Sequence, residues 1–141
     1  MISFPLFQVT QYASQAMPKI QHELAYIYKF MGDGNCGHLF DAIEHFVNVN
    51  YADPETAILE VSKKYGEHNW EKGIPLHCYI DSGLRHLLKF SRGDKDEPHD
   101  RAFIWNMFGA IWTCEHVPAD PDLIDIKFNV GSSITQDSKQ L

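Results

Sequence analysis

The chain has 141 residues, of which 44% are hydrophobic and 22% are charged, a composition typical of one globular domain. Its 19 acidic residues outnumber its 12 lysines and arginines, which gives a formal net charge of −7. Proteins that bind the phosphate backbone of nucleic acids carry a surplus of basic residues. These values exclude a wholly disordered chain and disfavour general nucleic-acid binding.

The cysteines and the amino terminus predict the compartment. Cys36, Cys78 and Cys114 lie far apart with no Cys-x-x-Cys pair, which is typical of a reducing environment. The first residues lack the basic and apolar regions of a signal peptide, and no apolar stretch is long enough to cross a membrane. We therefore expect a cytoplasmic protein with no membrane partner.

The first half of the chain predicts three helices. An amphipathic pattern over residues 12–31, started or interrupted at Pro18, predicts the first helix. The glycine-rich residues 32–37 are interpreted as a helix stop and turn, with a phosphate-binding loop as the alternative. Residues 39–49 form the second helix. Asp53 is a preferred N-cap before Pro54, so a third helix runs over residues 54–65.

The second half predicts two further helices. Residues 66–75 form a loop, residues 76–91 a fourth helix closed by Gly93, and residues 98 to 115 or 116 a fifth helix that is the most buried. Residues 123–130 alternate apolar and polar side chains, which predicts a strand, with residues 2–9 as its partner.

The fold class that these elements predict is mainly α: a compact bundle of about five helices, with a short terminal β-pair as an optional addition. Residues 1–130 make a single helical domain. Residues 131–141 are polar, and we expect them to form a flexible tail.

Side chains that could carry chemistry gather in three places. The loop after residue 63 combines polar donors with aromatic rings, although Trp70 could instead cover the core. Asp81 and Arg85 are four residues apart, so they form either part of a site or an ordinary surface ion pair. Asn106 lies in an apolar run, so its amide either bonds a backbone group or faces a polar pocket.

A family resemblance joins these places. The run Lys-Tyr-Gly-Glu-His-Asn-Trp-Glu-Lys-Gly-Ile-Pro over residues 64–75, the Arg-His-Leu element over 85–87, Gly93-Asp94, and His99 seven residues before Asn106 closely resemble a phage-associated family of helical domains. That family is catalogued as the amino-terminal domain of dATP/dGTP diphosphohydrolases. The resemblance covers about residues 61–112. It implies that the protein is located in the host cytoplasm if it is phage-encoded.

The resemblance also implies the site residues, which are Tyr65, Asn69, Trp70, Lys72, Asp81, Arg85, His86, His99 and Asn106. Members of the family often carry a second histidine three residues after the first in the fifth helix, and this chain has Ala102 there. A histidine pair at that spacing could hold a metal, so its loss argues against metal-dependent hydrolysis.

Our first hypothesis is a nucleotide-handling protein that resembles a (d)NTP diphosphohydrolase and releases a monophosphate and pyrophosphate. Arg85 and Lys72 would neutralise phosphate, Trp70 or Tyr65 would stack on the base, and Asn106 would read its polar edges. The catalytic acid or base would be His86 or His99. Magnesium is the candidate cofactor, and its candidate ligands are Asp41, Glu44, Asp81 and Asp96.

Two known metal patterns fit only in part. His86, His99, Asp100 and Asp120 could supply the ligands of an HD-type phosphohydrolase. The all-α pyrophosphohydrolases need two helical carboxylate pairs at i, i+3. Asp41 and Glu44 make one such pair, whereas Glu60 has no partner, so the second pair is missing. The second hypothesis is therefore a non-catalytic protein that sequesters a nucleotide signal. The third is a structural or adaptor protein that uses Trp70 and Trp105 in a contact between copies, and a homo-oligomer is the expected assembly.

Overall fold

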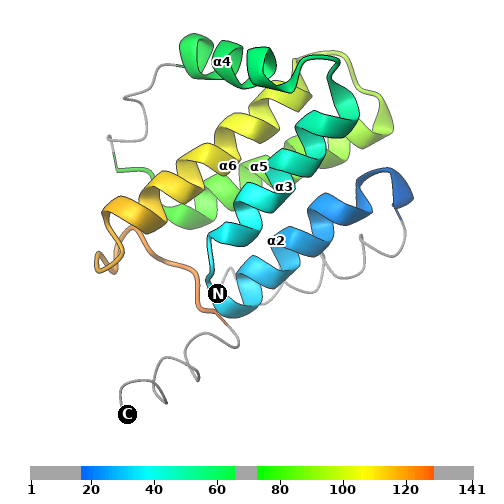
Figure 1. Ribbon diagram of the computed structural model, residues 1–141. Coiled ribbons are helices and arrows are strands. Elements are labelled where there is room, and N and C mark those ends of the chain that lie inside the picture. The colour runs from blue at the N-terminus through cyan, green and yellow to red at the C-terminus, as the bar shows by residue number, and fades with distance from the viewer. Residues whose placement is uncertain (1–16, 66–72, 129–141) are drawn as a thin grey trace.

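The computed structural model describes residues 17–65 and 73–128 of the chain. The described residues fold into one short 3₁₀ helix and five α helices, which together make an all-α bundle (Figure 1). The elements are η1 (Pro18–Ile20), α2 (Gln21–Asp33), α3 (Gly37–Asn50), α4 (Pro54–Tyr65), α5 (Leu76–Arg92) and α6 (His99–His116). The α helices alone hold more than half of the 141 residues. The prediction of a mainly helical bundle is confirmed.

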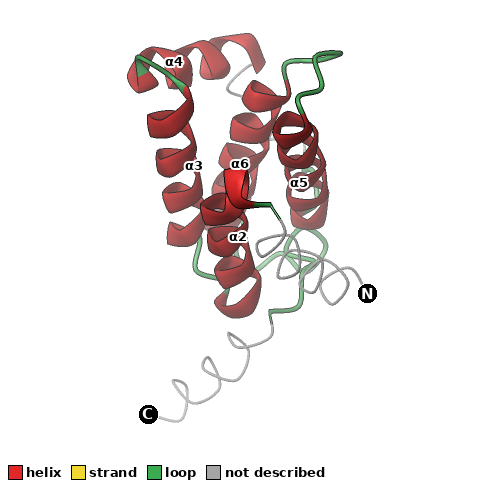
Figure 2. Ribbon diagram, turned by 90° about the vertical axis from the view of Figure 1, so that its right-hand side faces the viewer, coloured by secondary structure: helices red, strands yellow, loops and turns green. Residues whose placement is uncertain are grey.

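Two antiparallel helix pairs form the body of the bundle. α2 packs on α3, α5 packs on α6, and contacts between α3 and α6 join the two pairs. Figure 2 shows α4 lying across one end of the bundle, above α3 and α6. The core between the pairs is apolar and aromatic: Phe46 contacts the rings of Phe103 and Phe90, and Ile27 and Leu87 are fully buried.

Helix ends follow local signals in the sequence. Gly34 and Gly93 close α2 and α5 with φ angles of 73° and 91°, in the left-handed region that glycine adopts without steric cost. Asp53 caps α4, because its carboxylate accepts hydrogen bonds from the Thr56 N–H at 3.3 Å and the Thr56 hydroxyl at 2.7 Å. The glycine-rich residues 32–37 contain the end of α2, at Asp33, and the start of α3, at Gly37. They form a helix stop and turn, as predicted.

The first helix differs from its prediction. Within the described residues, Pro18–Ile20 form a single 3₁₀ turn, and the α helix begins only at Gln21. Pro18 carries no N–H and suits the start of a helix rather than its interior. Residues 12–16 of that prediction lie outside the described residues.

The predicted strand is wrong for the part of it that the structure describes. Residues 123–128 contain no strand, because the segment pairs with a helix start rather than with another strand. The Leu76 N–H donates to the Leu123 carbonyl at 2.7 Å, and the alternation instead buries Ile126 and places Phe128 against Phe30. The proposed partner, residues 2–9, and the tail over residues 131–141 lie outside the described residues.

The extent of the domain, residues 1–130, stays a prediction. In the ranges 17–65 and 73–128 the helices include none that is both long enough and apolar enough to cross a membrane. The compartment also stays a prediction.

Candidate functional site

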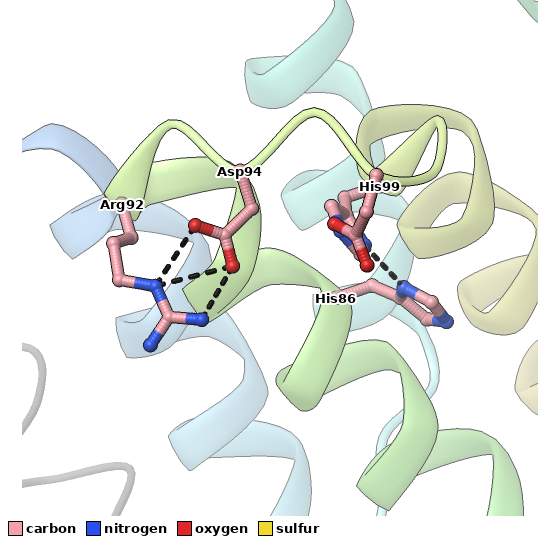
Figure 3. Close-up of polar contacts among 5 residues, drawn as sticks. His86, Arg92, Asp94 and His99 are labelled. Atoms are coloured by element: carbon pink, nitrogen blue, oxygen red, sulfur yellow. Dashed lines mark hydrogen bonds and ion pairs between the residues drawn. The ribbon is translucent and has the colours of Figure 1, made fainter.

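The turn between α5 and α6 gathers the polar side chains of the candidate site. Gly93 ends α5, five residues form the connection, and α6 begins at His99. Because the two helices are antiparallel neighbours, His86 of α5 lies opposite the first turn of α6. Figure 3 shows Asp94 between Arg92 on one side and the His86–His99 pair on the other.

His99 is the buried centre of this cluster. His99 is only 2% exposed. Its ring has two polar contacts: Nδ1 lies 2.8 Å from Nδ1 of His86, and Nε2 lies 2.7 Å from Oδ1 of Asp96. The Asp96 side chain is 62% exposed. The cluster therefore runs from a buried imidazole to a carboxylate in solvent.

The contact between the Nδ1 atoms of His86 and His99 limits which ring nitrogens of the two histidines can carry a hydrogen. One of these atoms must donate a hydrogen and the other must accept it. If Nε2 of a neutral His99 donates to Asp96, then His86 donates to His99. If Nε2 of His99 carries no proton, then His99 donates through Nδ1 to His86. The second arrangement leaves a lone pair on Nε2 that points toward the carboxylates.

Neighbouring groups shift the pKa values of His86, Asp94 and Asp96. Burial lowers the pKa of His86, an effect that the nearby Glu97 charge partly offsets. The hydrogen bond from His99 holds the pKa of Asp96 below its ordinary value. The hydrogen bonds from Arg92 lower the pKa of Asp94. Both carboxylates are therefore ionised at neutral pH, and a neutral His86 is favoured.

Asp94, Asp96 and His99 form a cluster that can hold a metal ion. One ligand atom from each residue lies within 4.8 Å of the other two. Two carboxylate oxygens with one imidazole nitrogen suit a divalent cation such as Mn²⁺ or Mg²⁺. A histidine that binds a metal donates its other N–H to a neighbouring group, and His86 is placed to accept that hydrogen bond. The residues present therefore fit a divalent cation.

A pocket of about 380 Å³ adjoins the cluster. It is lined by Phe90 and by residues 94–100. The side chains of Lys95 and Glu97 are exposed at its rim, while His99 forms part of its buried wall. A ligand can therefore reach the carboxylates from solvent.

The structure brings only some of the predicted site residues to this cluster. His86, His99 and Asp96 are there. Asp81 and Arg85 form an ion pair at 2.9 Å on α5, with side chains 58% and 53% exposed. The geometry of that pair is that of an ordinary surface contact.

Other predicted residues lie elsewhere. Asn106 is buried, and its amide donates to the Ala102 carbonyl of its own helix at 2.7 Å. Asp41 and Glu44 are exposed on α3. Residues 66–72, which include Asn69, Trp70 and Lys72, lie outside the described residues, as does the side chain of Tyr65.

The HD-type ligand set is not assembled. The Asp100 carboxylate accepts a hydrogen bond from the Tyr51 hydroxyl at 2.5 Å. Asp120 follows the carboxyl end of α6, and His99 opens that helix. The 18 residues of α6 separate the two by roughly 27 Å.

Two residues of the cluster were missed by sequence reasoning. Neither Asp94 nor Arg92 is among the site residues that the sequence predicts, although Gly93-Asp94 is part of the resemblance. The spacing Asp94-x-Asp96-x-x-His99 was the available signal, since it places two carboxylates just before a histidine in the first turn of a helix.

The cluster and the all-α bundle define a small helical domain with a candidate cation site. Residues 55–120 match the model of the family described as dATP/dGTP diphosphohydrolase, N-terminal. This range is a little under half of the chain and contains His86, Arg92, Asp94, Asp96 and His99. The predicted resemblance is thereby confirmed, and it relates this part of the chain to a family named for nucleotide hydrolysis. No curated protein and no solved structure matched the chain.

Proposed function

We propose that the chain hydrolyses a nucleoside triphosphate to a monophosphate and pyrophosphate, with a divalent cation held by Asp94, Asp96 and His99. The proposal rests on the ligand atoms of these residues, which lie within 4.8 Å of one another inside the segment that matches the family model. When bound, such a cation screens phosphate charge and lowers the pKa of a coordinated water.

The residues of the chain have distinct roles in this proposal. Asp94 and Asp96 supply negative charge, and both are ionised at neutral pH. With a cation bound, Nε2 of His99 would face the ion with its lone pair, in place of the hydrogen that it donates to Asp96. His86 is a positioning residue, because it accepts the Nδ1 hydrogen of His99 and so fixes the tautomer of the ligand. This role differs from the acid or base role that the sequence suggested for His86.

The test is a nucleotide panel with the purified full chain. Deoxy- and ribonucleoside triphosphates are incubated with Mn²⁺, with Mg²⁺ or with a chelator, and the products are separated by anion-exchange chromatography. We expect monophosphate and pyrophosphate only with a metal. Asp96→Asn should lower turnover at least 100-fold. Asp122→Asn, which changes an exposed aspartate beyond the other end of α6, should leave turnover unchanged.

The outcomes separate the hypotheses. Binding of a nucleotide without turnover supports the alternative function, a protein that sequesters a nucleotide. Neither binding nor turnover contradicts both and leaves the adaptor hypothesis, for which the oligomeric state in solution is the measurement. Equal turnover in wild type and Asp96→Asn removes the cluster from the reaction.

A further inference from the structure

The groove beside the cluster has a basic face. It has a volume of about 460 Å³ and is lined by Met17, Arg85, Leu88, Lys89 and Arg92. The three cationic residues lie at positions i, i+4 and i+7 of α5, so they share one face of the helix. They extend over roughly 10 Å along its axis, which is longer than a single phosphate group.

The cations of the groove differ in how they are paired. Arg85 is bound to Asp81, and Arg92 is bound to Asp94. Lys89 has no ion pair with any residue in the described ranges. Its charge also acts on the cluster, because it adds to the effect of Arg92 in lowering the pKa of Asp94.

Arg92 is hydrogen-bonded to the carboxylate of Asp94, which is one of the three candidate ligands of the cation. Its Nε lies 3.0 Å and 3.1 Å from the two oxygens of Asp94, and its Nη2 also bonds Oδ2. Both oxygens of this candidate ligand are therefore engaged by the guanidinium. A metal ion that uses Asp94 must displace at least one of these hydrogen bonds.

We infer that Arg92 is exchanged for the metal ion on Asp94 and then binds the phosphate chain of the substrate along the groove of Arg85 and Lys89. The inference rests on the proposed function, since it assumes a cation at Asp94. The displaced guanidinium keeps its charge and its planar donors, which suit phosphate oxygens. Arg92 lines the groove, and its guanidinium also bonds Asp94 of the cluster (Figure 3). A chain of two or more phosphates is the ligand whose charge complements this face.

The two halves of this exchange predict effects of opposite sign. Arg92→Gln removes the competitor, so it should bind Mn²⁺ at least threefold more tightly than wild type, as followed by the electron paramagnetic resonance of free Mn²⁺. The same variant should bind a premixed Mn²⁺–tripolyphosphate complex at least tenfold more weakly, as measured by calorimetry. A loss of folding cannot produce the gain.

Two further variants complete the design. Lys89→Gln should weaken binding of the tripolyphosphate complex and raise Mn²⁺ affinity less than Arg92→Gln does, because Lys89 acts on Asp94 only through its charge and is not bonded to it. Lys127→Gln removes the same charge from an exposed position in the segment after α6 and should change neither measurement. Melting curves of all variants establish that they are folded, which the 67% exposure of the Arg92 side chain leads us to expect.

The possible failures are distinguishable. If Arg92→Gln binds Mn²⁺ no more tightly than wild type, the exchange is wrong. If neither Arg92→Gln nor Lys89→Gln weakens the tripolyphosphate complex, the groove is not the phosphate site. If wild type binds Mn²⁺ and hydrolyses nucleotides in either case, the proposed function survives this inference. If wild type does not bind Mn²⁺ at all, both are overturned.

Discussion

The ring of Tyr79 on α5 lies directly against the backbone of Gly109 on α6. A Cβ atom added to Gly109 would lie 2.2 Å from Cε1 of Tyr79, which is far inside van der Waals contact. Tyr79 is itself 1% exposed and also packs on the ring of Trp105. The close approach of α5 and α6 therefore depends on a missing side chain, and the same approach places His86 against His99.

Gly109→Ala should destabilise the fold by about 1–3 kcal/mol, because an overpacked core has to shift to make room. Gly83→Ala is the matched control, since it changes the same residue type on the facing helix. Its added Cβ would meet Cε of Met107 at 2.5 Å, which is the flexible end of a side chain. The helix propensity of alanine, worth about 1 kcal/mol over glycine, should then keep Gly83→Ala near neutral. Urea unfolding measures both, and equal losses would contradict the prediction.

Tyr79→Phe should leave stability unchanged or raise it by up to about 1 kcal/mol. The Tyr79 hydroxyl is buried with no hydrogen-bond partner among the described residues, and burial raises the pKa of Tyr79 to about 12. Removing a buried polar group without a partner removes its desolvation penalty. Thermal and urea unfolding measure the difference. A clear loss of stability would reveal a partner for the hydroxyl.

Tyr51→Phe should weaken the dependence of stability on alkaline pH. Burial, followed by the hydrogen bond to Asp100, raises the pKa of Tyr51 above its ordinary value of 10.0. Below pH 10 both states of the protein keep the phenol proton, so this stability is fully present. As the pH rises above 10, the unfolded chain loses the proton first and stability falls.

The comparison of free energies of unfolding at pH 9 and pH 11 tests this sign. Wild type should lose about 1 kcal/mol more than Tyr51→Phe over that interval. Tyr79 contributes in the same direction in both proteins and cancels in the comparison. Parallel curves for the two proteins would show that Tyr51 titrates normally.

Asp125→Ala should lower stability by about 1 kcal/mol, the usual value of an N-terminal helix cap. The Asp125 carboxylate accepts a hydrogen bond from the His77 N–H at 2.9 Å and also contacts the His77 ring. Asp125→Asn retains an oxygen for the N–H and should lose less. Asp122→Ala, on the same segment, should be near neutral. Thermal unfolding compares them, and equal losses at positions 122 and 125 would argue against the cap.

The helices were predictable because their ends are local. Asp53, Pro54 and Gly93 act within one turn of the helix they bound, so a sequence window contains the whole signal. The terminal strand was not predictable in the same way. Alternation at Ile126 and Phe128 records which side chains face the core, and it does not record whether a second strand is available for pairing.

The candidate site was predictable only as residue types. His86 and His99 could be named as chemically capable, and Asp96 as a weak metal ligand. Their contact depends on how α5 and α6 align, which is set by packing at positions such as Gly109. Arg92 and Asp94 become part of the candidate site only because that alignment places them beside His86 and His99. The predicted roles of Trp70 and Lys72, which lie outside the described residues, stay predictions.

The placement of α4 across one end of the bundle implies that the fold does not open as one unit. α4 contributes Ala57 and Val61 to the buried residues, while Leu59 is 60% exposed. The α5–α6 pair instead buries side chains from Leu76 to Leu87 of α5 and from His99 to Thr113 of α6. Segments with few buried contacts open at a lower free energy than the global unfolding transition. Amide protons of α4 should therefore exchange with deuterium well before those at the centres of α5 and α6, and simultaneous exchange in all three helices would contradict this.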